Sequence, residues 1–175
     1  MATQKIRAGS AREQDTAAFE AFFLQHYQRV YQVVFRLVGD PAQADDLTLE
    51  AFWRLWNQRL RSTNNLQGWL FRVATNLGYN ALRADKRRSY YENRGQPEQD
   101  SSPDPTTEAL RADDRERVRR ALRRLPARQA QLLILRHSDF SYQEIAAALD
   151  LAPNSIGTLL ARAEREFVKK YEEGE

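Results

Sequence analysis

The stretch that decides the fold runs from Ser141 to Ala163 and reads SYQEIAAALDLAPNSIGTLLARA. Ser141, followed three residues later by Glu144, is the pattern of a capping box, in which a hydroxyl and a carboxylate satisfy exposed amides at a helix start. Asp150 stands where a tight turn between two helices needs a left-handed backbone, which Asp tolerates better than most residues. Pro153 suits the first position of a following helix. The stretch therefore predicts a helix-turn-helix.

The second helix of this motif has one apolar and one polar face. Its inward side chains are expected at Ile156, at Leu159 or Leu160, and at Ala163. The opposite face carries Asn154, Ser155, Gly157, Thr158, Ala161, Arg162 and Arg165. Short polar groups near the start, followed by Arg, are what a helix needs to reach base edges and phosphates. The pattern favours a DNA-reading helix, and an ordinary helical hairpin with a solvated outer face is the alternative.

Helical periodicity continues on the N-terminal side of the motif. Further helices are expected over 16–38, from 41 to a break at 62–65, over 66–88, over 108–124 and from 126 onward. Between the first two, Gly39 can end one helix, while Asp40 caps the next and Pro41 opens it. No segment of useful length alternates with period two, so the expected fold class is all-α.

The charge pattern divides the chain into blocks. Residues 16–88 carry ten basic and six acidic side chains, a net charge of +4, and residues 114–175 carry twelve and ten, a net charge of +2. Between them, residues 89–113 carry two basic and six acidic side chains, a net charge of −4. Basic blocks point to a polyanionic partner, although solvated helix faces produce the same composition.

The acidic block also lacks residues that could be buried. Its main part, SYYENRGQPEQDSSPDPTT, contains three prolines and a glycine, which predicts a flexible acidic linker. The expected organisation is two small helical domains on either side of this linker. The boundaries are an N-terminal tail over 1–15, a first domain over 16–88, a linker over 89–112 and a second domain over 113–175.

Composition excludes several function classes. The 175 residues contain no cysteine and two histidines, which removes disulfide frameworks, thiol nucleophiles and thiolate metal sites. The acidic pairs Asp45-Asp46 and Asp113-Asp114 are adjacent and diverge on a helix, an arrangement unsuited to shared metal or acid–base chemistry. Neither a secretory signal nor an apolar run long enough to cross a bilayer is visible. We expect a cytoplasmic protein that is not an enzyme and uses no cofactor or metal.

Two blocks of the chain resemble the extracytoplasmic-function (ECF) group of bacterial sigma factors, which have two conserved domains called regions 2 and 4. In the first block, GDPAQADDLTLEAFWRLW resembles the helix of region 2 that binds core polymerase, and LQGWLFRVATNLGYNALR resembles its promoter-melting segment, which reads the −10 element. In the second, RRLPARQAQLLILR and the helix-turn-helix resemble region 4, which binds the −35 element. The resemblance covers roughly residues 16–88 and 114–170.

The resemblance implies three sets of binding residues. Those that bind core RNA polymerase are Asp45, Asp46, Leu47, Leu49, Glu50, Phe52, Trp53 and Trp56. Those that bind the −10 element are Asn64, Arg72, Asn76, Tyr79, Asn80, Arg83, Arg87 and Arg88. Those that bind the −35 element are Pro153, Asn154, Ser155, Gly157, Thr158, Arg162 and Arg165. Packing into the hydrophobic core is the alternative for Leu47, Phe52, Trp69 and Tyr79.

The chain departs from the family pattern at several positions. Leu49 replaces the usual Gln and Asn80 the usual Asp, while Gly157 and Leu159 stand at common Lys or Arg positions and Ala152 replaces a Ser-type cap. The first change bears on polymerase affinity. Those in the second domain reduce the positive charge of the reading helix, so the −35 sequence of another member does not transfer to this chain.

The resemblance implies a subunit that directs promoter recognition and transcription initiation without chemistry of its own. Its expected partners are the largest and second-largest subunits of core RNA polymerase, promoter DNA and an anti-sigma factor, with no membrane insertion. Two alternatives remain open. One is a helix-turn-helix regulator that acts without joining polymerase, and the other is a sigma-like module that binds an anti-sigma protein.

Overall fold

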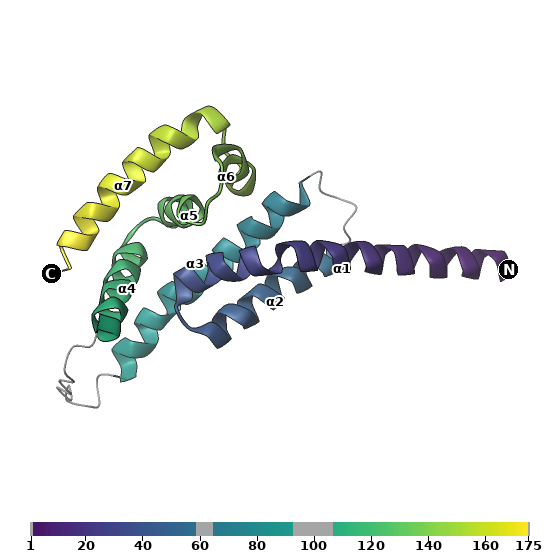
Figure 1. Ribbon diagram of the computed structural model, residues 1–175, viewed down its shortest axis with the longest axis horizontal. Coiled ribbons are helices and arrows are strands. Elements are labelled where there is room, and N and C mark those ends of the chain that lie inside the picture. Colours follow the sequence, from purple (N-terminus) through teal and green to yellow (C-terminus); the bar gives the residue numbers. More distant parts are fainter. Residues whose placement is uncertain (1, 59–64, 93–106, 175) are drawn as a thin grey trace.

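The computed structural model describes the backbone of residues 2–58, 65–92 and 107–174, and the side chains of 15–58, 65–84 and 111–174. In these ranges all regular structure is helical (Figure 1), which confirms the all-α prediction. The helices are α1 (Ala2–Val38), α2 (Pro41–Asn57), α3 (Leu66–Glu92), α4 (Thr107–Arg124), α5 (Ala127–Arg136), α6 (Tyr142–Leu149), the 3-10 helix η2 (Pro153–Ser155) and α7 (Ile156–Glu172).

Helices α1, α2 and α3 form a first lobe. The turn between α1 and α2 is the one predicted: Gly39 has a positive φ of 77°, and the side chain of Asp40 accepts a hydrogen bond from the Gln43 amide at 2.6 Å. Pro41 opens α2. Helix α1 is longer than expected, because it begins at Ala2 and not at Thr16. The added segment contains no proline, so nothing in it interrupts the helix.

The core of the first lobe comes from apolar side chains that recur at helical spacing along α1, α2 and α3. Val30, Val34 and Leu37 of α1 are fully buried against Phe52 of α2 and Leu70 of α3, while the earlier aromatic residues of α1 are only partly buried. This packing places the outer face of α2 and one face of α3 at the surface of the lobe.

Helices α4 to α7 form a second lobe that contains the predicted helix-turn-helix. The side chain of Ser141 accepts a hydrogen bond from the Glu144 amide, and the Glu144 carboxylate accepts one from the Ser141 amide, so the capping box is present. Asp150 adopts the left-handed conformation, with φ 56° and ψ 56°. On α7 the buried positions are Ile156, Leu160 and Ala163, which resolves the choice between Leu159 and Leu160.

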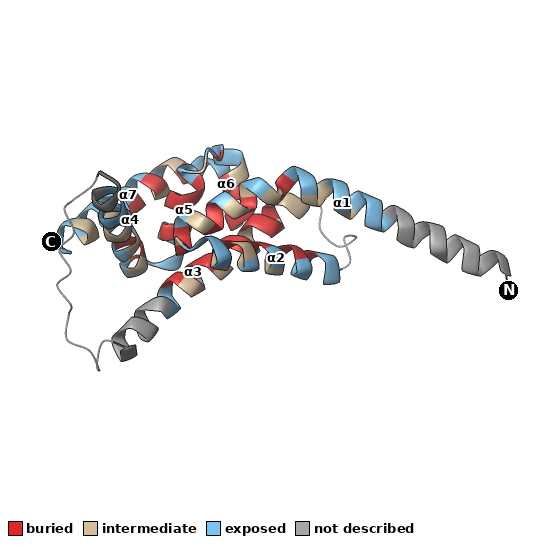
Figure 2. Cartoon of the chain, turned by 60° about the horizontal axis from the view of Figure 1, so that its bottom comes forward, coloured by how far each residue is buried: buried red, intermediate tan, exposed pale blue. Residues whose placement is uncertain are grey.

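The two lobes pack directly on each other, an arrangement that the sequence left open. Buried residues of both belong to one continuous hydrophobic cluster, and α3 lies against α5 and α6. The buried faces of α3, α5 and α6 meet between the lobes (Figure 2). Helices α3 and α4 extend to Glu92 and from Thr107, into the predicted linker, whose residues 93–106 lie outside the described part of the chain.

Candidate nucleic-acid and polymerase interfaces

The outer face of α2 is apolar and exposed. Trp53, Leu49 and Trp56 have exposed fractions of 60%, 45% and 37%. They border a shallow hollow of about 480 Å³, which is also lined by Phe19 and by Phe52, itself only 2% exposed. The Trp56 and Phe19 rings meet edge to face at 4.9 Å, which holds that indole against the hollow. Indole and leucine side chains grouped on one surface are typical of a protein-binding site.

The acidic side chains of α2 lie in three different environments. Asp46 is exposed, whereas Asp45 is half-buried and accepts a hydrogen bond from the Tyr27 hydroxyl. That hydrogen bond, with a smaller effect of burial, raises the pKa of Tyr27 to about 12. Glu50 pairs with Arg54 of the same helix at 2.8 Å. Leu47 is partly buried and packs against the hydrophobic core.

The polar face of α3 presents Arg72, Asn76, Asn80 and Arg83 at three- and four-residue intervals, which places them along one side of the helix. Asn76, Asn80 and Arg83 are exposed and Arg72 is half-buried. Tyr79 is different, because it is only 3% exposed. Of the remaining predicted −10 residues, Asn64 and the side chains of Arg87 and Arg88 lie outside the described residues.

In this structure the second lobe contacts that face of α3. The Arg72 Nε donates to the Ala148 carbonyl at 2.9 Å, and the Gln131 Nε2 donates to the Asn76 Oδ1 at 2.5 Å. The Tyr79 hydroxyl donates to the carbonyl of Leu125 at 2.5 Å, and burial raises the pKa of Tyr79. Three residues predicted to contact DNA therefore contact the second lobe.

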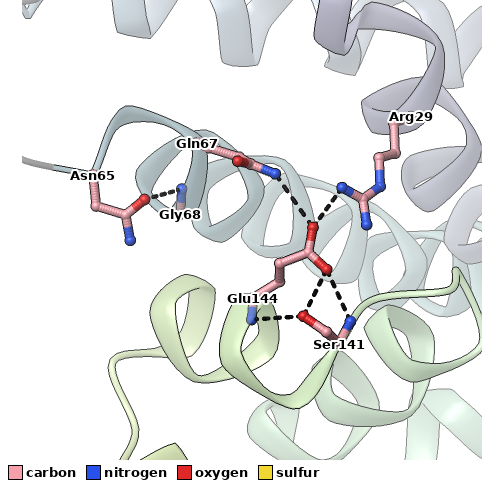
Figure 3. A network of polar contacts seen from close by, with 6 residues as sticks. All are labelled: Arg29, Asn65, Gln67, Gly68, Ser141 and Glu144. Atoms are coloured by element: carbon pink, nitrogen blue, oxygen red, sulfur yellow. Dashed lines mark hydrogen bonds and ion pairs between the residues drawn. The ribbon is translucent and has the colours of Figure 1, made fainter.

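A second set of polar contacts joins the lobes beside α3 (Figure 3). The Arg29 Nη1 of α1 lies 2.7 Å from the Glu144 Oε1 of α6, and both side chains have an exposed fraction of 33%. The Gln67 Nε2 donates to the same oxygen at 3.5 Å, while the other carboxylate oxygen belongs to the capping box with Ser141. The hydrogen bond from Arg29 is the main cause that lowers the pKa of Glu144 to about 2.

The polar face of α7 is open to solvent. Thr158, Arg162 and Arg165 of α7 are exposed, as are Pro153 and Asn154 of the preceding η2. Two other predicted residues are partly buried. Ser155 donates to the Ala152 carbonyl at 2.7 Å, and Gly157 lies beside Tyr142. The helix has the expected features of a reading helix, with short side chains at its start and Arg in its second turn and beyond.

Within residues 15–58, 65–84 and 111–174 no group of acidic and histidine side chains is arranged to hold a metal ion. Among the described helices, none is long and apolar enough to cross a membrane.

Comparison with known proteins assigns both lobes. A family model described as Sigma-70 region 2 matches residues 22–88, and one described as Sigma-70, region 4 matches residues 115–167. The chain belongs to the ECF group of RNA polymerase sigma factors. Members of this group direct promoter recognition and transcription initiation with core RNA polymerase, and they are not enzymes. The first lobe is thus region 2 and the second lobe region 4.

Curated relatives carry the same description. The ECF RNA polymerase sigma factor SigE of Mycolicibacterium smegmatis is 35% identical over 81% of this chain, and the match spans 55% of that relative's length. SigL of Mycobacterium tuberculosis is 29% identical over 91% of this chain and 92% of its own length. The ECF RNA polymerase sigma-E factor of Escherichia coli is 25% identical over 97% of this chain and 95% of its own length.

Two solved structures share the fold. CnrH, in complex with the cytosolic domain of CnrY, covers 94% of this chain and 94% of its own with a TM-score of 0.59 and 20% identity. RpoE of Bartonella quintana, in complex with the anti-sigma factor NepR, covers 89% of this chain and 97% of its own with a TM-score of 0.53 and 22% identity.

One residue of this sigma factor that the sequence analysis did not single out is Arg29. It follows His26 and precedes Val33 at helical spacing on a largely buried side of α1. A positively charged side chain on a largely buried side of a helix indicates an ion-pair partner on another element. The sequence does not show which residue that partner is. Glu144 was recognised as a helix cap, and its second role as the partner of Arg29 depends on the packing of the lobes.

Proposed function

We propose that this sigma factor binds core RNA polymerase through the outer face of α2. The exposed indoles of Trp53 and Trp56 and the side chain of Leu49 supply apolar area, and Asp46 and Glu50 supply negative charge beside it. An acidic and apolar surface suits a basic helical partner. Phe52 supports this face from beneath, because it is buried in the core of the lobe.

The polar face of α3 reads the −10 element in this proposal. Arg72 and Arg83 bind phosphates, and Asn76 and Asn80 hydrogen-bond to the edge of an unstacked base. Melting follows from trapping an unpaired base, so that no nucleotide hydrolysis is required. Asn64, Arg87 and Arg88 complete the set of residues proposed to bind the −10 element, on the resemblance of the sequence alone.

The polar face of α7 reads the −35 element. Asn154 of η2 and Thr158 near the start of α7 face base edges, while Arg162 and Arg165 face phosphates, and all four are exposed. The contribution of charge is modest because Arg162 and Arg165 are the only basic residues among those proposed for this face.

The observation that carries the proposal is that α2, α3 and α7 present three chemically distinct faces on the two matched regions. In vitro transcription with purified core polymerase and a promoter library tests it. We expect the protein to co-purify with core polymerase and to direct initiation at discrete start sites. Absence of both would contradict the proposal, while operator binding without polymerase binding would support a separate regulator.

We also propose that the protein acts in the cytoplasm and is controlled by an anti-sigma factor. The support is the RpoE structure in complex with NepR, which shares this fold. Pull-down of a purified candidate anti-sigma protein, followed by loss of transcription on its addition, tests the assignment. A candidate that binds without lowering transcription would contradict its role as an inhibitor.

A further inference from the structure

A cavity of about 610 Å³ lies between the end of α1 and the helices α4, α5 and α7. No described residue of α2 or α3 lines it, and α7 contributes Glu164, Phe167 and Val168 in place of the residues proposed to read the −35 element. The volume is in the range of sites for small molecules. The cavity is therefore a candidate binding site that lies apart from the three proposed binding faces.

The cavity has a largely apolar lining. Leu122, Leu133 and Ile134 are buried residues of its wall. Val118 and Val168 also line it, and their exposed fractions are 38% and 52%. Exposed valines beside a hollow with buried leucine and isoleucine side chains favour a ligand with an apolar body.

Arg119 of α4 supplies the least satisfied polar group of the lining. Its side chain is 17% exposed, and its Nη1 lies 3.5 Å from a carboxylate oxygen of Glu116. The other carboxylate oxygen of Glu116 pairs with Arg123. The Arg119 Nε is buried and has no hydrogen-bond acceptor among the described residues. Because a buried donor without an acceptor costs free energy, this guanidinium favours a ligand that supplies oxygen acceptors.

The other charged groups of the lining are exposed and of both signs. They are Arg36, Arg115, Asp114 and Glu164, together with the titratable His137. Solvent screens these groups, and the two arginines offset the two carboxylates. The partly buried charge of Arg119 therefore decides which ligand charge is favoured. A carboxylate forms charge-assisted hydrogen bonds with a guanidinium, whereas an ammonium group is repelled by it.

We propose that this cavity binds an amphipathic monocarboxylic acid. The carboxylate of the ligand binds the Arg119 guanidinium, and its apolar chain lies against Leu122, Leu133 and Ile134. Because α1 belongs to region 2 and the other three helices to region 4, the ligand contacts both regions. The inference does not depend on the proposed function, since the cavity uses none of the residues assigned to polymerase or promoter binding.

The preference for an acid is tested by isothermal titration calorimetry of the full chain. The probes are octanoate, octan-1-ol and octyltrimethylammonium, all below micelle formation, which share an apolar chain and differ in the charge of the head group. Octanoate is expected to bind at least tenfold more tightly than either of the others, the lower end of the range for a hydrogen bond between charged groups. Equal affinities, or tighter binding of octyltrimethylammonium, would overturn the acid site.

The role of Arg119 is tested by Arg119→Met, which removes the guanidinium and keeps an unbranched apolar side chain. This variant is expected to bind octanoate at least tenfold more weakly and to bind octan-1-ol within about twofold of wild type. Unchanged affinity for octanoate would overturn the proposal.

The matched control is Arg120→Met, because Arg120 is the next residue of α4, is exposed and does not line the cavity. It is expected to leave the affinity for both probes unchanged. Equal weakening of octanoate binding by Arg119→Met and Arg120→Met would indicate an effect of net charge and would overturn the assignment of Arg119.

The location of the site is tested by filling the cavity. Val168→Trp adds bulk from a half-exposed position of the lining, so the fold is expected to be retained. Saturating octanoate is expected to raise the thermal unfolding midpoint of wild type and of Arg120→Met, and to leave that of Val168→Trp and Arg119→Met unchanged. An equal rise in all four proteins would place the ligand elsewhere and overturn the proposal.

Discussion

At the residue scale, His26 shows how burial sets a protonation state. It packs against Phe22 at 4.3 Å and Phe71 at 6.5 Å between ring centroids, and burial, followed by the charge of Arg29, lowers its pKa below 6.5. The unfolded chain therefore binds a proton more readily than the folded chain. The stability that comes from keeping His26 neutral is fully present above pH 6.5. It is lost as the pH falls through the lower pKa that His26 has in the folded state.

We therefore expect the urea midpoint of the wild type to be lower at pH 5.5 than at pH 7.5, and His26→Phe to reduce that difference. His137→Gln is the control, because His137 is exposed, and it is expected to retain the difference. Equal midpoints of the wild type at both pH values would contradict this account of His26.

Two glycines give opposite predictions for the same substitution. Gly39 has a φ of 77°, and a Cβ there would lie 2.1 Å from the Arg119 Cζ, so Gly39→Ala is expected to cost about 1–3 kcal/mol of unfolding free energy. Gly157 has ordinary space, with the nearest atom of Tyr142 at 3.6 Å, so Gly157→Ala is expected to add about 0.5–1 kcal/mol. Denaturant unfolding of both variants checks the sign of each change.

At the element scale, α6 depends on its cap. Ser141→Ala removes two hydrogen bonds of the Ser141 hydroxyl, one accepted from the Glu144 amide and one donated to the Glu144 carboxylate. It is expected to lower the unfolding free energy by about 1 kcal/mol. Ser155→Ala is the control, because the Ser155 side chain donates to the Ala152 carbonyl and, although Ser155 stands at the N-cap of α7, makes no cap hydrogen bond to that helix. Equal effects in urea unfolding would contradict the assigned cap.

Helix α2 carries neighbouring aromatic residues with different expected roles, since Trp53 is expected to contribute to polymerase binding and Phe52 to stability. Trp53→Ala is expected to change the unfolding free energy by less than about 0.5 kcal/mol, because the side chain is 60% exposed, while weakening polymerase binding at least tenfold. Phe52→Ala is expected to cost about 3–5 kcal/mol, because that ring is 2% exposed. Unchanged polymerase affinity of Trp53→Ala, measured by fluorescence titration, would remove α2 from the interface.

At the scale of the whole molecule, the elements could be predicted from the sequence because their signals are local. The capping box at Ser141, the turn at Asp150 and the break at Gly39 each depend on residues a few positions apart. Apolar periodicity also predicted the inward face of α7, where Ile156 and Ala163 are buried together with Leu160, one of the two candidates between them.

The contact between the two lobes could not be predicted, because it joins residues that are distant in the sequence and that each have a local explanation. Gln131 lies in an apolar run of α5. From the sequence, Phe71 and Phe140 would each be expected in the core of their own lobe, whereas in the structure their rings contact each other. Family resemblance predicts that α3 reads DNA, but nothing in the sequence indicates that region 4 contacts this helix. Tyr79 is an example, because it was predicted to contact DNA and its hydroxyl donates a hydrogen bond to the Leu125 carbonyl of region 4.

Reading of the −10 element by α3 is tested by open-complex formation with core polymerase and either wild type or Asn76→Ala. Wild type is expected to melt promoter DNA at discrete start sites. Asn76→Ala is predicted to bind core polymerase normally and to lose most strand opening, measured by permanganate reactivity of unpaired thymines. This variant also removes the acceptor of the Gln131 hydrogen bond, so Gln131→Ala is the control and is expected to retain strand opening. Equal loss of polymerase binding and melting, or no loss of melting, would contradict the account.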